Sequence, residues 1–232
     1  MNDSLPQPRA SRPTPRWPWG FWRRWVGANA LAELLGLGGS ALLWIAYFMG
    51  LEAHLGVMAS AAVVVGGSTL LEGTAVGVLQ WLVLRRALPK LSLASWWSAT
   101  AIGALIAWSL GMIPSTLMAM ADTASAAPSP AEMSDALQYT LAALMGLVLG
   151  PVLGFPQWLV LRRHITHAGL WIAANAVAWC WGMLVIFIVI GFVPAGGITL
   201  ATGLIVLSGL ALAGAVVGAI HGVVLVKLVS LS

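Results

Sequence analysis

The sequence predicts an all-α membrane protein in which six transmembrane helices form three parallel two-helix repeats in a pseudo-threefold bundle. Three observations carry this prediction. The 232 residues are 60% hydrophobic and 8% charged, whereas soluble domains contain about 25% charged residues. Six windows reach the length of about 20 mostly apolar residues that a spanning helix needs. A glycine-containing motif recurs at the end of every second window.

The first apolar window follows a basic segment. Residues 1–24 contain five prolines and five arginines without an apolar core, so they do not resemble a cleavable signal peptide. We expect a disordered cytoplasmic tail, rich in Pro, Arg and Trp, that contacts anionic lipid or only sets the topology. Residues 25–232 then form the transmembrane domain. Its six windows are 26–49, 57–84, 94–120, 136–161, 169–193 and 199–230.

Alternate windows share a motif, so two consecutive windows make one repeat. The second, fourth and sixth end with Gly-x-x-x-Gly-x-x-(Gln/His), which continues as Trp-Leu-Val-Leu-Arg-Arg in the first two cases. The first, third and fifth open with Trp-x-x-Ala-(Asn/Thr)-Ala. The repeats therefore cover approximately 25–86, 94–163 and 169–230. Because each repeat crosses the membrane twice, all three share one orientation, and we expect the axis relating them to follow the membrane normal.

The positive charges predict the topology. All eleven Lys and Arg residues lie in the tail or at helix ends that face the same side: Arg9, Arg12, Arg16, Arg23, Arg24, Arg85, Arg86, Lys90, Arg162, Arg163 and Lys227. By the positive-inside rule both termini are cytoplasmic. We expect a bacterial cytoplasmic (inner) membrane or an internal membrane, and no nucleic-acid partner.

Tryptophans gather near the same side. We expect these indoles to sit at the headgroup level as a one-sided aromatic belt. The nine are Trp17, Trp19, Trp22, Trp25, Trp81, Trp96, Trp97, Trp158 and Trp171.

Six polar side chains are predicted to form one layer inside the bundle. The Gln or His of each motif lies three and seven positions after the glycines, so it shares their helix face, and such glycines mark close helix packing in membranes. The Asn or Thr of the other motif lies at a similar depth. This candidate polar layer is Asn29, Gln80, Thr100, Gln157, Asn175 and His221. Two interpretations stay open: hydrogen bonding that holds the bundle together, and a polar constriction or solute site.

Two carboxylates, Glu33 and Glu72, lie within predicted spans. A charge at the bilayer centre costs at least about 2.5 kcal/mol, so each must be protonated, paired or hydrated. Both are expected to face the interior. The matched positions of the other repeats hold Ala104, Trp179, Leu149 and Ala213. The acids could relay a proton or bind a cation, or they could be a neutral hydrogen-bonded pair.

Catalytic and metal sites are not predicted. The sequence has no clear nucleophile-and-base pair, paired-aspartate or His-Glu-x-x-His motif, so we expect no enzyme. The single cysteine, Cys180, excludes an intrachain disulfide. His221 is the one histidine within a span, and a ring nitrogen can ligate haem iron or the magnesium of a pigment. A single-pigment or haem-binding subunit is therefore kept as a third alternative, and no other cofactor is expected.

The repeated Gln-Trp-Leu-Val-Leu-Arg-Arg and Trp-x-x-Ala-(Asn/Thr)-Ala motifs resemble those of uncharacterised bacterial multipass membrane proteins. The resemblance covers nearly all of the chain after the tail. It implies an architecture and no activity.

The leading functional prediction is a non-enzymatic accessory or scaffold subunit, because nearly all of the chain lies in the bilayer. Its partners would be lipid, other membrane proteins or a second copy of the chain. The alternative is a small-solute or proton-coupled transporter that uses Glu33, Glu72 and the polar layer. A water-accessible cavity that reaches Glu72 would favour transport, and a packed, dry interior with a large apolar outer patch would favour the subunit.

Overall fold

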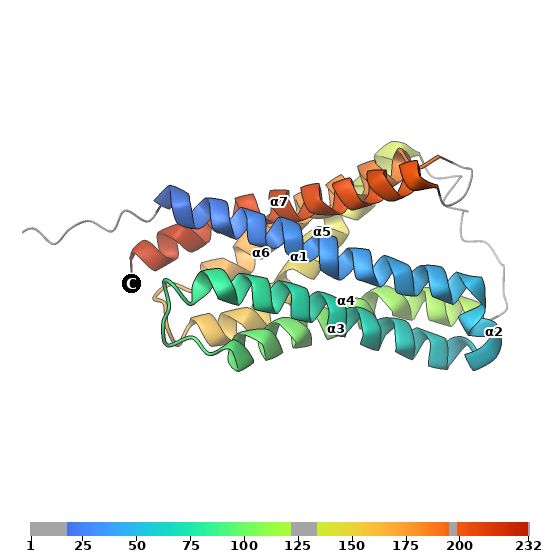
Figure 1. Ribbon diagram of the computed structural model, residues 1–232, viewed down its shortest axis with the longest axis horizontal. Coiled ribbons are helices and arrows are strands. Elements are labelled where there is room, and N and C mark those ends of the chain that lie inside the picture. The colour runs from blue at the N-terminus through green and yellow to red at the C-terminus, as the bar shows by residue number, and fades with distance from the viewer. Residues whose placement is uncertain (1–17, 122–133, 195–198, 232) are drawn as a thin grey trace, which may run out of the picture.

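The computed structural model describes residues 18–121, 134–194 and 199–231, none of which forms a strand (Figure 1). The helical elements are α1 Pro18–Ala46, the kinked segment η1 Tyr47–Leu51, α2 Glu52–Leu55, α3 Val57–Leu84, α4 Leu93–Ala121, α5 Asp135–Leu161, α6 Leu170–Gly191 and α7 Leu200–Ser230. Six of them, α1 and α3 to α7, are long and apolar enough to cross a membrane. The prediction of an all-α protein with six candidate membrane spans is confirmed.

Helix α1 begins earlier than predicted, at Pro18. Proline at the first helical position loses no hydrogen bond and already has a helical φ. The first turns also pack, because Phe21 is buried and the Trp22 indole donates to the Ala219 carbonyl of α7 at 3.0 Å. Residues 18–24 are therefore helical and not part of a disordered tail. Residues 1–17 lie outside the described residues.

A compact reversal joins α1 to α3 through η1 and α2. Gly50 has a φ of 126° and Gly56 a φ of 77°, conformations that glycine adopts without a steric penalty. The reversal returns α3 alongside α1 (Figure 1).

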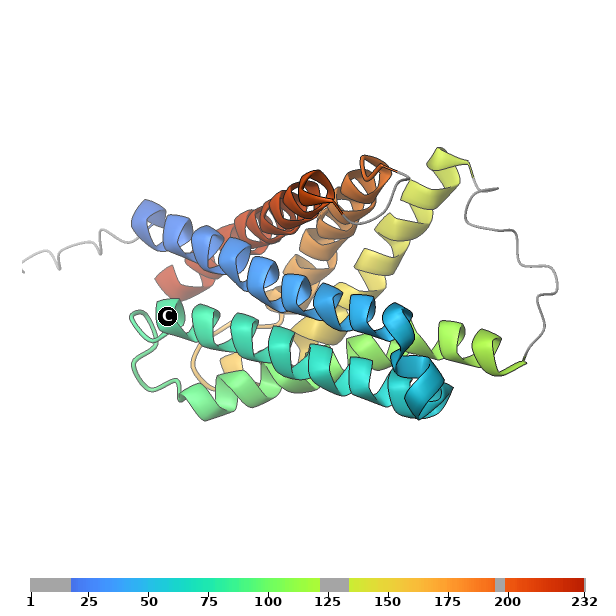
Figure 2. The same ribbon diagram turned by 45° about the vertical axis from the view of Figure 1, so that its right-hand side comes forward.

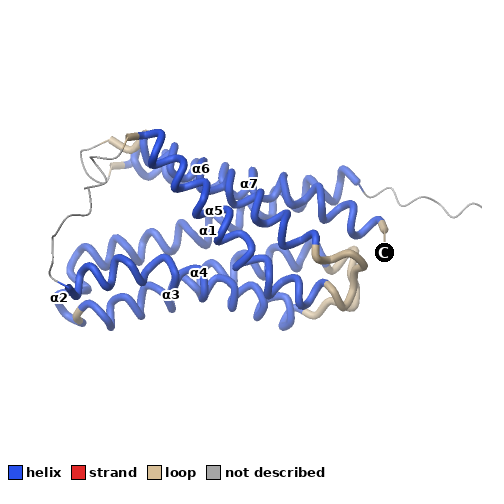
Figure 3. The backbone as a smooth tube through the Cα atoms, turned by 180° about the vertical axis from the view of Figure 1, so that it is seen from behind, coloured by secondary structure: helices blue, strands red, loops and turns tan. Residues whose placement is uncertain are grey.

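The six long helices form a closed ring. Each packs against the next one along the chain, and α7 packs against α1 to complete the circle. Figure 3 shows these helices from behind. Among the described residues, the backbones of helices on opposite sides of the ring do not approach one another. The centre of the ring is therefore filled by side chains or left open.

The motif glycines lie where neighbouring helices approach most closely. A Cβ added at Gly73 of α3 would come within 2.9 Å of the Ala101 Cα on α4, and one at Gly218 of α7 within 2.8 Å of the Asn29 Cβ on α1. A Cβ at Gly150 of α5 would collide with the backbone of α6. The predicted close-packing glycine face thus occurs at α3–α4, α5–α6 and α7–α1.

The two ends of the ring differ. We call the end with the start of α1 and the end of α7 the terminal end, and the opposite one the distal end. From the terminal end toward the distal end, α5, α6 and α7 diverge from α1, α3 and α4 (Figure 2). The bundle is therefore narrow at the terminal end and wide at the distal end.

An apolar plug fills the terminal end. Its largest members are fully buried and come from all six helices: Trp25, Leu84, Trp96, Leu161, Trp171 and Leu225. Each leucine lies four residues after Gln80, Gln157 or His221, one helical turn closer to the terminal end. The plug therefore lies directly beneath the polar layer.

Candidate functional site

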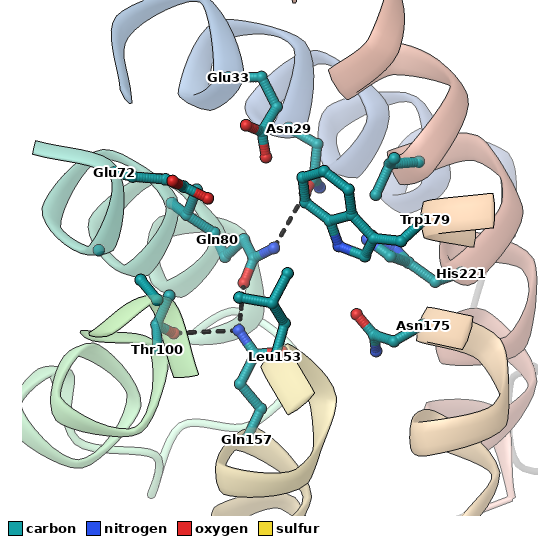
Figure 4. Close-up of a pocket in the computed structure, with 14 residues that line it drawn as sticks. Asn29, Glu33, Glu72, Gln80, Thr100, Leu153, Gln157, Asn175, Trp179 and His221 are labelled. Carbon is teal, nitrogen blue, oxygen red and sulfur yellow. Dashed lines mark hydrogen bonds between the residues drawn. The ribbon is translucent and has the colours of Figure 1, made fainter. Parts of the chain in front are cut away.

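The structure brings the six residues of the predicted polar layer together. All are at most 4% exposed, and all line one small cavity in the centre of the ring, which we call the polar cavity (Figure 4). Its volume is about 20 Å³, enough for one water molecule.

Amide side chains connect four helices across this cavity. The Gln80 amide donates to Asn29 Oδ1 at 2.9 Å. The Gln157 amide donates to Gln80 Oε1 at 3.2 Å and to Thr100 Oγ1 at 3.0 Å (Figure 4). Bonds of this kind contribute about 0.6 kcal/mol each in membranes. The polar layer therefore joins helices, as expected if its hydrogen bonds hold the bundle together.

Two tryptophans extend the network, which the sequence analysis did not anticipate. The Trp25 indole donates to His221 Nδ1 at 2.9 Å, and the Trp171 indole donates to Gln157 Oε1 at 3.0 Å. Trp96, at the matched position of α4, is equally buried, but its Nε1 has no hydrogen-bond partner. The expectation that these three lie at the headgroup level is wrong. Of the other tryptophans in that set, Trp19 is 74% exposed, and Trp17 lies outside the described residues.

The motif itself contains the signal for this arrangement. Asn29 and Asn175 donate to the Trp25 and Trp171 carbonyls, each at 2.8 Å, and the Thr100 hydroxyl donates to the Trp96 carbonyl at 2.9 Å. Residues four apart share a helix face. A tryptophan one turn before an inward Asn or Thr is therefore expected to point inward as well.

His221 is enclosed and does not suit a porphyrin. Its Nδ1 accepts the Trp25 hydrogen bond, and its ring centroid lies 5.5 Å from that of Trp25 and 5.0 Å from that of Trp171. The adjoining polar cavity of about 20 Å³ is far too small for a haem or chlorophyll. The histidine fits the role of a hydrogen-bond acceptor within the layer.

Both predicted intramembrane acids face the interior and line the polar cavity (Figure 4). Glu33 is 2% exposed, and its Oε2 has no hydrogen-bond partner. Glu72 is 7% exposed, and its Oε2 accepts from the Trp108 indole at 2.6 Å. The acids are held by close packing, since a Cβ at Gly36 would lie 2.8 Å from the Glu72 Cα and one at Gly214 would lie 2.7 Å from the Glu33 Cγ.

A second, larger cavity occupies the distal half of the ring. We call it the distal chamber. Its volume is about 410 Å³, within the range of sites for small molecules. All six long helices contribute to its lining, which is almost entirely apolar: Leu37, Ser40, Ala41, Trp44, Glu72, Ala107, Trp108, Gly111, Leu149, Leu153, Trp179, Met183, Ile186, Ile190 and Leu210.

The distal chamber and the polar cavity are neighbours. Glu72, Leu153 and Trp179 line both of them, so these three side chains form the partition between the two spaces. Among the described residues, Glu72 is the one ionisable residue in the lining of the chamber, and no described Lys or Arg lines either space. The order from the distal end is chamber, partition, polar cavity and apolar plug.

Comparisons with models of known protein families, with curated proteins and with solved structures find no match. The resemblance to uncharacterised bacterial multipass membrane proteins stays a prediction.

Proposed function

We propose that the protein is a small-solute transporter of the membrane, coupled to protons through Glu33 and Glu72. The observation that carries the proposal is the distal chamber, an interior space of about 410 Å³ that reaches Glu72. A cavity that reaches this carboxylate favours transport over a purely structural role, and the proposal requires that water can enter it.

The layered interior supports the proposal. A solute in the chamber meets the Glu72, Leu153 and Trp179 partition, then a polar cavity with room for about one water molecule, and then the buried tryptophans and leucines of the plug. A path that is wide at one end and sealed at the other suits one conformation of an alternating-access cycle. In the other conformation the halves α1, α3, α4 and α5, α6, α7 would close at the distal end and separate at the terminal end.

We propose further that the three hairpins are equivalent repeats around an axis along the membrane normal. Three features support this. The ring closes in chain order. The motif glycines of each returning helix face the first helix of the next hairpin. The bonds Trp25–His221 and Trp171–Gln157 join positions that the repeats make equivalent. Glu33 and Glu72 belong to one repeat only, so a coupling site would break this symmetry.

The same proposal includes the orientation of the bundle in the membrane. Arg85, Arg86 and Lys90 lie between α3 and α4, Arg162 and Arg163 between α5 and α6, and all of these are at the terminal end. The positive-inside rule then places the terminal end in the cytoplasm and opens the distal chamber toward the outer side of the membrane.

The experiment that tests the proposal is gentle extraction of the tagged chain from its membrane, followed by sizing and mass spectrometry of everything that remains bound. A transporter is expected to elute alone or with copies of itself, and to carry a small molecule that Ala41→Phe, which narrows the chamber, displaces. A stoichiometric partner protein, with no small molecule lost in that variant, would contradict transport and support the accessory-subunit prediction instead. Leu105→Phe, at a position 45% exposed on the outside of α4, is the matched control.

A further inference from the structure

In the part of the chain that the structure describes, the acids of the interior have no cationic partner. The titratable side chains that line the two spaces are Glu33 on α1, Glu72 on α3 and His221 on α7, and the lining residues of α4, α5 and α6 are neutral. A buried carboxylate without a counterion is strongly unfavourable. Each acid is therefore neutral while the chamber is empty, or it requires a cation that the protein does not supply.

The walls of the chamber suit a cation of one kind. Trp44, Trp108 and Trp179 line the space, and indole faces attract cations more strongly than other aromatic rings do. The Trp108 Nε1 is already bonded to Glu72, which fixes one indole beside the carboxylate. A positive charge placed near Glu72 would meet a counterion, in a chamber that three indole side chains help to line.

The rest of the chamber lining does not suit an inorganic cation. Hard metal ions require several oxygen ligands, and the described residues contain no group of three or more His, Cys, Asp or Glu side chains that could hold one. Aliphatic residues such as Leu37, Ile186 and Leu210 cannot replace a shell of water. They do match a large apolar body. The ligand that fits therefore combines one positive charge with a hydrophobic surface.

We propose that the distal chamber binds a monovalent lipophilic organic cation, with Glu72 as its counterion, and that binding releases a proton from the Glu33 and Glu72 pair. The inference rests on the proposed transport function and names its substrate class. No covalent bond forms: a carboxyl O–H gives its proton to water, and the resulting carboxylate pairs with the cation. Glu72 borders the chamber, whereas Glu33 lines the polar cavity alone. Glu72 is thus the direct partner, and Glu33 is the second proton-holding group.

The test uses two ions of the same shape and opposite charge on the purified full-length protein in detergent. Tetraphenylphosphonium should bind at least about tenfold more tightly than tetraphenylborate, a difference of about 1.4 kcal/mol. In weakly buffered solution an indicator dye should report proton release that saturates together with binding. Equal affinity for both ions, or phosphonium binding without proton release, would overturn the inference. This comparison needs no variant, so it does not depend on how well any variant folds.

Variants of the two acids then test which carboxylate pairs with the cation. Glu72→Gln should weaken phosphonium binding at least about tenfold and abolish proton release, and Glu33→Gln should reduce the proton release. Asp135→Asn is the matched control, because Asp135 is an exposed acid in the first turn of α5 and should leave both signals unchanged. Unchanged binding in a folded Glu72→Gln variant would overturn the assignment.

A neutral probe separates this inference from the function on which it rests. N-phenyl-1-naphthylamine becomes fluorescent in apolar pockets and carries no charge at neutral pH. Suppose that this probe binds, that Ala41→Phe prevents its binding, and that the protein binds the phosphonium and the borate equally well. The proposed substrate class is then wrong, and the proposed solute chamber is still supported. If none of the three probes is excluded by Ala41→Phe, the chamber and the proposed function both fail.

Discussion

The terminal and distal halves of the bundle are built from the same helices but differ in what the close-packed glycines meet and in what fills the centre. In the terminal half, Gly73, Gly150 and Gly218 sit against the backbone or Cβ of the neighbouring helix, and six large side chains fill the centre. In the distal half, Gly67 and Gly209 meet the ends of side chains, those of Leu43 and Val189, and Gly66 has open space at its Cβ position. The centre of this half is a chamber of about 410 Å³. The terminal half is closely packed, and the distal half has room for a ligand and for helix movement.

The largest expected effect on stability comes from substituting glycines in the two halves. Gly150→Ala should lower the free energy of unfolding by about 2 kcal/mol or more, because the new methyl group meets the backbone of Asn175 and Ala176 on α6. Gly66→Ala should instead raise it by up to about 1 kcal/mol through helix propensity. Thermal unfolding in detergent measures both. Equal changes of the same sign would show that the halves are packed alike.

The polar layer provides the next effect. Gln157→Leu removes bonds to Gln80, Thr100 and Trp171 and leaves the Trp171 indole N–H buried without a partner, so we expect a loss of about 2 kcal/mol. Thr100→Val removes one acceptor in a side chain of similar shape and should cost about 1 kcal/mol or less. The same unfolding assay ranks the two variants. A larger loss for Thr100→Val would mean that Gln157 does not hold the centre of the network.

Much of this layer could be predicted from the sequence. The spacing of Gln80, Gln157 and His221 after paired glycines places them on the packing face, and Glu33 and Glu72 follow from the cost of charge in the bilayer. The inward tryptophans were missed because an indole near a helix end also suits a headgroup region, and only the step of four residues to an inward Asn or Thr distinguishes the two cases. The distal chamber could not be predicted, since it depends on how far α5, α6 and α7 diverge from the other helices.

A smaller effect compares the three buried tryptophans. Trp171→Phe loses the bond to Gln157, whereas Trp96→Phe removes an N–H that has no partner. Both changes leave similar voids, so Trp171→Phe should be the more destabilising by about 1 kcal/mol. Equal losses in thermal unfolding would indicate that the Trp171 bond contributes nothing, and a larger loss for Trp96→Phe would mean that its indole N–H is bonded in the membrane.

The measurement that tests the central claim most directly is one-sided thiol labelling in sealed vesicles of known orientation. In a Cys180→Ala background, Ala41→Cys places a thiol in the lining of the distal chamber, and Leu105→Cys places one on the exposed outer surface of α4. A membrane-impermeant charged maleimide should label Ala41→Cys from the distal side alone and Leu105→Cys from neither side. Labelling of Ala41→Cys from the terminal side, or no labelling from either side, would contradict a chamber that opens distally above a closed terminal plug.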